Sequence, residues 1–187
     1  MTLLQYLLMP AERQREITLI LEVMKPLPFF YRGLWWWKKR HGVERLTDLT
    51  WGEVRAVIDL LLGSGELPQV IEAFRLVYKI KHPARMNVYR FYACIKHLTN
   101  EVQRVIEQEQ RALQGEPSPY EAQLQQAGVE QLQPFRDLAI IDTLAQGDIL
   151  RYEQVEALPY DVVFYTLYYR TVRQNIDNRF QQIMTKK

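Results

Sequence analysis

The chain has 187 residues, 48% of them hydrophobic and 25% charged, with a formal net charge of +2 and a single cysteine, Cys94. This balance excludes an intrinsically disordered chain, and one cysteine excludes an internal disulfide bond. No apolar run approaches the roughly 20 residues of a membrane-spanning helix. The first residues lack the basic start and small-residue cleavage site of a secretion signal, so we expect a soluble protein of the cytoplasm.

Charge is distributed unevenly along the chain. Residues 1–100 contain 15 Lys or Arg and 9 Asp or Glu, whereas residues 101–187 contain 9 and 13. This polarity predicts either a basic face for an anionic partner or two surfaces through which copies of the chain attract one another. An uneven surface without a function is an equally good interpretation.

Helical periodicity dominates the pattern of apolar residues, and we expect an all-α protein of about six to eight helices. Proline and glycine mark many of their ends: Pro10 suits a first helical turn, Pro26 cannot continue a helix, and Gly63 suits a helix end. The expected helices cover residues 10–25, 50–63, 66–81, 83–113, 118–127, 133–146 and 158–187. In the helix over 133–146, Pro134 is expected in the first turn.

Two of the expected helices are long and carry apolar residues at steps of three and four. Such stripes are typical of helices that pack through one face. In the helix over 83–113 the stripe has coiled-coil spacing and consists of Val88, Phe91, Ile95, Leu98, Val102 and Val105. In the last helix it consists of Val162, Tyr169, Val172, Ile176, Phe180 and Ile183. A shorter stripe begins just before the helix over 133–146 and continues into it; it consists of Leu132, Phe135, Leu138 and Ile141.

We interpret these elements as a single-domain bundle covering residues 1–187. Residues 26–47 form an aromatic and basic connecting segment, and residues 114–118 form a short linker. The sequence FFYRGLWWW has the best strand pattern in the chain, so a short hairpin near residues 29–37, around Gly33, is the one β element that we admit.

The connecting segment contains three successive tryptophans followed by a basic run. Successive residues turn by about 100° on a helix and face opposite sides on a strand, so neither geometry sends all three indoles into one core. Three interpretations stay open: the aromatics fill gaps beneath a loop, they form a protein-binding surface, or they contact a nucleic acid or membrane surface. The second is the leading functional interpretation, with contact residues Tyr31, Trp35, Trp36, Trp37, Lys38, Lys39 and Arg40.

Three tyrosines of the last helix, Tyr165, Tyr168 and Tyr169, form a second candidate surface for a partner. Tyrosine suits protein interfaces because it buries a ring while its hydroxyl stays in water. The alternative is that these rings pack between neighbouring helices with their hydroxyls at the rim.

No catalytic, cofactor or metal motif stands out, so we expect a non-enzymatic protein without a cofactor or metal. Cys94 and His97 share one side of a helix, but two ligands do not make a metal site, and a packed thiol beside a partly exposed imidazole is the better description. Asp142 and Asp148 flank Gly147, which looks like a helix end followed by a turn acid. The chain has no phosphate-binding loop, dinucleotide-binding glycine turn or nucleophile elbow.

The stretch IIDTLAQGDILRYEQVEALPYDVVFYTLYYRTVRQN, residues 140–175, resembles the C-terminal part of small helical tail-assembly chaperones of tailed bacteriophages and prophages. The likeness lies in an apolar-Asp-x-Leu-Ala-x-Gly-Asp-Ile stretch, a Tyr-x-x-Val pair and the Leu-Pro-Tyr that opens the last helix. The resemblance implies a factor of the host cytoplasm that coats the helical tape-measure protein before tail polymerisation. Grooves of such a chaperone would accept an amphipathic helix of the tape-measure protein.

Two functional hypotheses follow. The leading one is a phage or prophage assembly or structural protein that acts through protein–protein contacts, either as a tail-assembly chaperone or as a virion component that forms a homo-oligomer. The alternative is a nucleic-acid-binding accessory protein that uses the basic aromatic segment 29–41. An enzyme is kept only as a formal third class.

Overall fold

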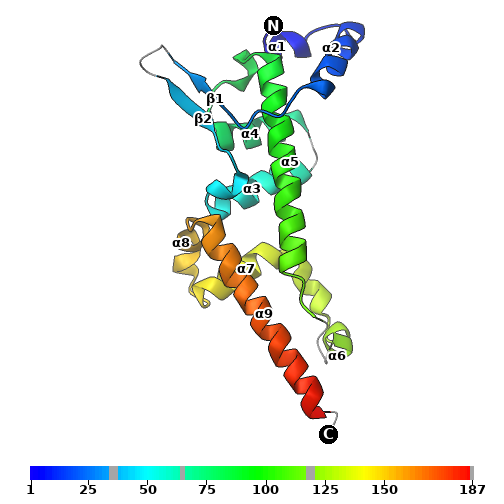
Figure 1. Ribbon diagram of the computed structural model, residues 1–187, viewed down its shortest axis with the longest axis vertical. Helices are drawn as coiled ribbons and strands as arrows, with labels where there is room; N and C mark the ends of the chain where they lie inside the picture. Colours follow the sequence, from blue (N-terminus) through cyan, green and yellow to red (C-terminus); the bar gives the residue numbers. More distant parts are fainter. Residues whose placement is uncertain (34–37, 64–65, 117–120, 186–187) are drawn as a thin grey trace. The chain divides into compact units, whose positions relative to one another are not determined.

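The computed structural model describes residues 1–33, 38–63, 66–116 and 121–185, which form two compact units (Figure 1). The first unit is drawn from residues 1–49 and 53–105, and the second from residues 50–52 and 106–187. The predicted all-α class is confirmed, because helices make up most of both units. The interpretation of residues 1–187 as one domain stays a prediction.

The first unit begins with two helices and a hairpin. These elements are α1 (Leu3–Leu7), α2 (Ala11–Val23), β1 (Phe29–Arg32) and β2 (Lys39–Gly42). The side chains of Thr2 and Gln5 cap the start of α1 reciprocally. The predicted helix over 10–25 is present as α2, which begins one residue later, with Pro10 at its N-cap. The strands are antiparallel, with Tyr31 opposite Arg40.

The hairpin is present, but its second strand lies further along the chain than predicted. The connection runs from Arg32 to Lys39, because these residues form the last pair of the register. The prediction placed the turn at Gly33, since the second strand is polar and carries no period-two apolar signal. The indoles of Trp35, Trp36 and Trp37, which were predicted contacts, lie outside the described residues.

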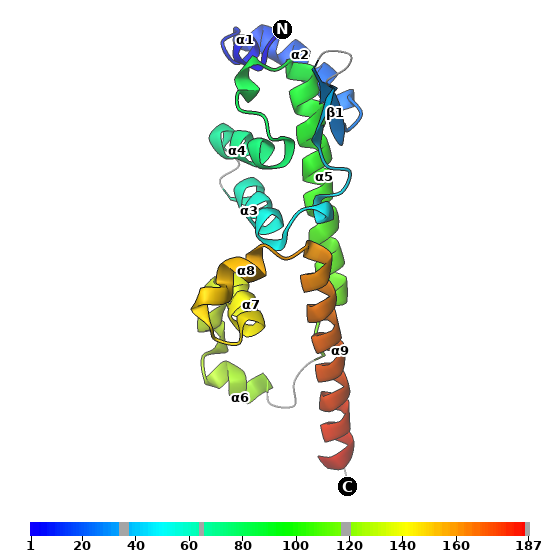
Figure 2. The same cartoon turned by 90° about the vertical axis from the view of Figure 1, so that its left-hand side faces the viewer.

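Three helices and two short 3₁₀ segments follow. They are η1 (Leu46–Asp48), α3 (Trp51–Leu62), α4 (Leu67–Tyr78), η2 (Pro83–Arg85) and α5 (Val88–Ala112). All but the first two residues of α3 and the end of α5 after Val105 belong to the first unit. Figure 2 shows α3 and α4 following one another along α5. The predicted start of the long helix at Pro83 is wrong: residues 83–85 form a 3₁₀ turn, Met86 is extended, and the side chain of Asn87 accepts hydrogen bonds at the start of α5.

The core of the first unit is built on one face of α5. Of its six predicted stripe residues, Ile95 is half-buried and the other five are at most 3% exposed. Aromatic rings of α4 pack against this face: the Phe74 ring lies 4.9 Å from that of Phe91 and 4.5 Å from that of Tyr78, measured between ring centroids. The stripe predicted from the sequence therefore acts as the core of this unit.

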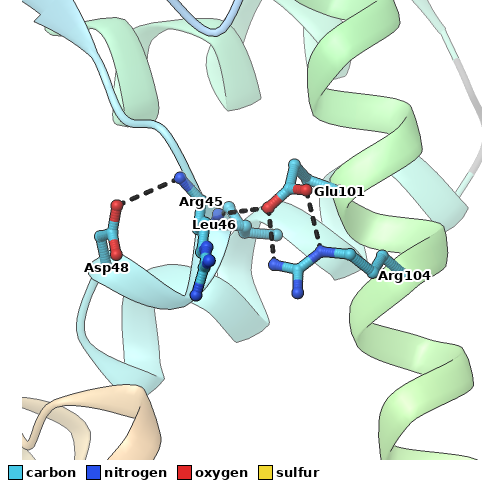
Figure 3. Close-up of polar contacts among 5 residues, drawn as sticks. All are labelled: Arg45, Leu46, Asp48, Glu101 and Arg104. Carbon is cyan, nitrogen blue, oxygen red and sulfur yellow. Dashed lines mark hydrogen bonds and ion pairs between the residues drawn. The ribbon is translucent and has the colours of Figure 1, made fainter.

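A polar contact joins η1 to α5 (Figure 3). The carboxylate of Glu101 accepts hydrogen bonds from the Leu46 backbone nitrogen at 2.8 Å and from Nε and Nη2 of Arg104 at 2.9 and 2.8 Å. Partial burial by itself raises the pKa of Glu101, but these hydrogen bonds and the charge of Arg104 outweigh it. The net result is a pKa below the ordinary value, so Glu101 favours its charged form.

The second unit contains shorter helices and one long one. They are α6 (Glu121–Gln126), η3 (Val129–Phe135), α7 (Arg136–Ala145), η4 (Ile149–Arg151), α8 (Tyr152–Glu156) and α9 (Tyr160–Thr185). Ile141 and Ala145 of α7 pack against Val155 of α8. The side chain of Trp51 is fully buried and stacks on the ring of Tyr160 at 5.6 Å.

The predicted helix over 133–146 needs two corrections. Pro134 lies inside the 3₁₀ segment η3 rather than in the first turn of an α-helix, since its ring and missing N–H do not fit a continuing α-helix. Of the stripe predicted here only Ile141 is buried, whereas Leu132, Phe135 and Leu138 are exposed. This stripe does not form a core by itself.

Candidate partner-binding surface on α9

One side of α9 holds this helix to its own unit. The rings of Tyr160 and Phe164 are buried, and the Tyr160 hydroxyl donates to Oε1 of Glu109 at 2.8 Å. Further along, Oδ1 of Asn175 accepts a hydrogen bond from the backbone nitrogen of Glu116 at 2.8 Å, and Arg179 forms an ion pair with the Glu116 carboxylate. These contacts fix which side of α9 faces its own unit.

A different side of α9 is apolar and exposed. Seven apolar or aromatic residues lie there at steps of three or four, and each side chain is between 39% and 65% exposed. We name this set the α9 seam, and it consists of Val162, Tyr165, Tyr169, Val172, Ile176, Phe180 and Ile183. Large exposed apolar patches are unusual on monomeric soluble proteins, so this stripe is a candidate interaction surface.

The seam and the buried side point in nearly opposite directions. At about 100° per residue, the seven seam residues fall within a stripe about 80° wide, whose centre is about 145° from the side that carries Tyr160, Phe164 and Asn178. Through its buried side, α9 already packs against the rest of its own unit. The seam therefore offers a second apolar face, over several turns of a 26-residue helix.

Charged residues border the seam without entering it. By the same helical geometry, Asp161 and Arg179 lie along one edge, and Arg173 and Asp177 along the other. An apolar centre with a charged rim of both signs is the usual anatomy of a protein–protein interface. A strongly anionic partner such as nucleic acid would instead favour a rim of one sign.

The structure brings two of the three predicted tyrosines onto this surface. Tyr165 and Tyr169 belong to the seam and are 64% and 65% exposed, whereas Tyr168 lies beside it and stacks on Phe164. Ile176, Phe180 and Ile183 were predicted as one side of a helix but not as contact residues. Their spacing is the same as that of a core stripe, so the sequence carries no signal that they would be exposed.

The hairpin presents the other predicted surface. Tyr31 is 57% exposed, and Lys38, Lys39 and Arg40 are exposed as well. On this outer face the guanidinium of Arg40 lies 3.9 Å from the centroid of the Phe29 ring, a cation–π contact. The structure thus places all four described members of the predicted set at the surface, and their role in binding stays a prediction.

Cys94 and His97, which were considered as possible metal ligands, lie in environments typical of packing residues. Burial is the main cause that raises the pKa of the Cys94 thiol to about 12, which keeps it protonated and unreactive. Burial likewise lowers the pKa of His97 and so favours the neutral imidazole. In the part of the chain that the structure describes, no three His, Cys, Asp or Glu side chains are grouped as metal ligands would be.

The two aspartates near Gly147 are engaged with neighbouring residues. Asp142 accepts a hydrogen bond from the Tyr152 hydroxyl at 2.6 Å. Asp148 caps η4 by accepting from the backbone nitrogen of Leu150 at 3.0 Å, and it forms an ion pair with Arg151. These three contacts stabilise the connection from α7 to α8.

Among the described residues, no helix combines the length and apolar character that crossing a membrane requires. Comparison of the chain with protein-family models, with curated proteins and with solved structures gives no match.

Proposed function

We propose that this chain is a non-enzymatic assembly protein that acts through protein–protein contacts, with the α9 seam as its main binding surface. The observation that carries the proposal is the seam itself, an exposed apolar stripe opposite the side that packs within the unit. A partner helix with apolar residues at i, i+3, i+4 and i+7 would match this spacing and bury both stripes. Tyr165, Tyr169 and Phe180 supply the large rings that usually dominate such interfaces.

We further propose that the partner is the tape-measure protein of a phage or prophage and that the chain is a tail-assembly chaperone of the host cytoplasm. This part of the proposal is supported by the resemblance of residues 140–175 to such chaperones, a stretch that runs from α7 into α9 and includes the first part of the seam. A tape-measure protein is a long helical chain, so it would offer an apolar stripe of suitable length. A second copy of this chain, as in a virion component, is the competing occupant.

Co-expression of the full chain with the tape-measure protein of its own genome tests this proposal. After nuclease treatment, we expect the two proteins to be purified together and to separate from any homo-oligomer in size-exclusion chromatography with light scattering. Ile176→Asp places a charge in the seam and should weaken the complex by about ten-fold or more, because burying an unpaired carboxylate is unfavourable. Gln174→Asp adds the same charge at an exposed position outside the seam and serves as the matched control.

Two results would count against the proposal. If Ile176→Asp and Gln174→Asp weaken the complex equally, the seam is not the binding surface. If the wild-type chain forms only a homo-oligomer, and Ile176→Asp dissociates it, the occupant of the seam is a second copy rather than a tape-measure helix.

The second candidate function is nucleic-acid binding by the hairpin, favoured by the exposed run Lys38, Lys39 and Arg40. For this function, affinity for single-stranded DNA should fall steeply with added salt, since cations that neutralise phosphates release counterions. It should also collapse in a Trp36→Ala, Lys39→Ala variant, because aromatic stacking and charge are both removed. Affinity that is unchanged by salt or by this variant would exclude the hairpin as a nucleic-acid site.

A further inference from the structure

A basic pocket lies within the first unit. Its cavity of about 510 Å³ is lined by the inner face of the hairpin, the residues that follow α4, and the start of α5. This volume falls in the range of small-molecule sites. The side chains alternate along the strands, so Phe30 and Arg32 of β1, with His41 of β2, face the pocket, whereas Tyr31 and Arg40 face the other way.

The lining is strongly cationic. Five Lys or Arg residues and two histidines contribute to it, and no Asp or Glu among the described residues does. The cations come from four parts of the fold: Arg32 from β1, Lys79 and Lys81 from the residues after α4, Arg85 from η2 and Arg90 from α5. Like charges gathered around one cavity repel one another, and a bound anion would relieve this repulsion.

Several of these cations have no carboxylate partner among the described residues. Lys79 is engaged, because its Nζ lies 2.7 Å from Oε1 of Glu53, and the Arg90 guanidinium lies 5.2 Å from the Phe30 ring centroid. Arg32, Lys81 and Arg85 are exposed, and none of them forms an ion pair with a carboxylate in the described part of the chain. Three charged side chains are therefore available to a ligand.

The start of α5 adds to the positive potential. Met86 and Asn87 line the pocket directly before this 25-residue helix, whose N-terminal end carries the positive end of the helix dipole. Asn87 already accepts hydrogen bonds from the backbone nitrogens of Tyr89 and Arg90 at 3.0 and 3.3 Å. The N-terminal end of α5 therefore contributes a positive electrostatic potential, while direct contacts with a ligand would come from the side chains.

The aromatic residue of the pocket is not available to stack on a ligand. The buried Phe30 ring is stacked on His41 at 5.6 Å and on Tyr78 at 5.9 Å between centroids. His41 in turn donates from Nδ1 to the Tyr78 carbonyl oxygen at 2.9 Å, which fixes its ring. The pocket thus recognises charge rather than a nucleobase.

We propose that this pocket binds the phosphate groups of an anionic ligand, with Arg32, Lys81 and Arg85 as the contact residues. Guanidinium groups match the geometry of phosphate oxygens through paired hydrogen bonds, and a lysine adds a compact charge. The phosphates can belong to a free oligophosphate or to the backbone of a nucleic acid. The site is independent of the α9 seam.

The test is a calorimetric titration of the full chain with sodium tripolyphosphate at low ionic strength. The wild-type chain should bind, and Lys81→Gln with Arg85→Gln should weaken binding by about ten-fold or more, because charge-assisted hydrogen bonds are lost. Arg13→Gln with Arg15→Gln removes the same charge from exposed positions of α2 and should change the affinity less than about two-fold. No binding, or equal weakening in both variants, would overturn the proposal.

Two further ligands distinguish the source of the phosphate. If oligothymidylate binds and tripolyphosphate displaces it, the site takes a nucleic acid backbone; if only tripolyphosphate binds, the site takes a free oligophosphate. Poly-glutamate that binds as tightly as tripolyphosphate, with the same loss in the Lys81, Arg85 variant, would reject phosphate in favour of an acidic peptide. Ile176→Asp in the seam should leave every one of these affinities unchanged, so this result and that of the helix-binding test are separable.

Discussion

At the scale of single residues, Tyr78 shows how one side chain connects several parts of the first unit. Its hydroxyl lies 3.1 Å from the carbonyl oxygens of both Leu27 and Cys94, and its one proton is shared between them. The ring stacks on Phe74 and Phe30. Burial is the main cause that raises the pKa of Tyr78 far above its ordinary value, so the hydroxyl stays a hydrogen-bond donor.

Gly42 of β2 meets this tyrosine so closely that no side chain fits. It has a φ of +98°, and a Cβ there would lie 2.5 Å from the Pro28 carbonyl oxygen and 2.6 Å from Cε1 of Tyr78. We expect Gly42→Ala to lower the free energy of unfolding by about 3 kcal/mol, because overpacking adds to the strain of a left-handed backbone. Urea denaturation at pH 7 measures this change.

Gly147 provides the control for this prediction. It also has a positive φ, +78°, but a Cβ there would meet no atom of the described residues within 4 Å. Gly147→Ala should therefore lower the free energy of unfolding by only about 1 kcal/mol, from backbone strain alone. If the two substitutions lower the free energy of unfolding equally, a steric clash with Tyr78 does not add to the effect of Gly42→Ala.

At the scale of elements, Glu101 makes the attachment of η1 to α5 sensitive to acid (Figure 3). Its pKa in the folded chain is below the ordinary value of 4.5, so its stabilising effect is complete above pH 4.5 and is lost as the pH falls further. We expect Glu101→Gln to lower the free energy of unfolding by about 2 kcal/mol at pH 7, where charged hydrogen bonds are lost. The difference from wild type should shrink as the pH is lowered.

Urea denaturation between pH 7 and pH 3 measures both effects. Glu16→Gln, at an exposed position of α2, is the matched control and should leave the free energy of unfolding nearly unchanged at pH 7. A difference between wild type and Glu101→Gln that stays constant down to pH 3 would contradict the assignment, because it would not depend on the charge of Glu101.

At the scale of the whole molecule, the compact units do not follow the order of the chain. Residues 50–52 lie between two segments of the first unit, yet they belong to the second. Trp51 explains this assignment: its ring stacks on Tyr160, and its backbone nitrogen donates to the Leu158 carbonyl oxygen at 2.8 Å. A short segment of the N-terminal half thus completes the core of the C-terminal half.

We expect Trp51→Ala to destabilise the second unit by about 3–5 kcal/mol, the usual effect of removing a buried large aromatic side chain. Hydrogen exchange should show the largest loss of protection at the amides of Val163 and Phe164 in α9. Trp51→Phe keeps a stacking ring and should have a smaller effect. Equal loss of protection at Phe74 and Phe91 would contradict the division into two units.

The sequence also predicted much of the element order, and the misses have physical causes. The starts of α2 and α4 follow from Pro10 and from the break at residues 63–66, because helix-ending residues act locally. The start of α5 was misplaced because Pro83 fits the first turn of an α-helix and of a 3₁₀ turn equally well. The basic pocket was not predicted at all, since Arg32, Lys81 and Arg85 come together only through the fold.

By itself, the sequence determined that α5 and α9 are helices with apolar stripes, because a period of three and four residues is a property of the local chain. Only the tertiary structure decided that the stripe of α5 is a core while that of α9 is a surface. The physical reason is that burial depends on what lies opposite a stripe. Phe74 and Tyr78 of α4 pack against the α5 stripe or beside it, whereas no described part of the chain covers the α9 seam.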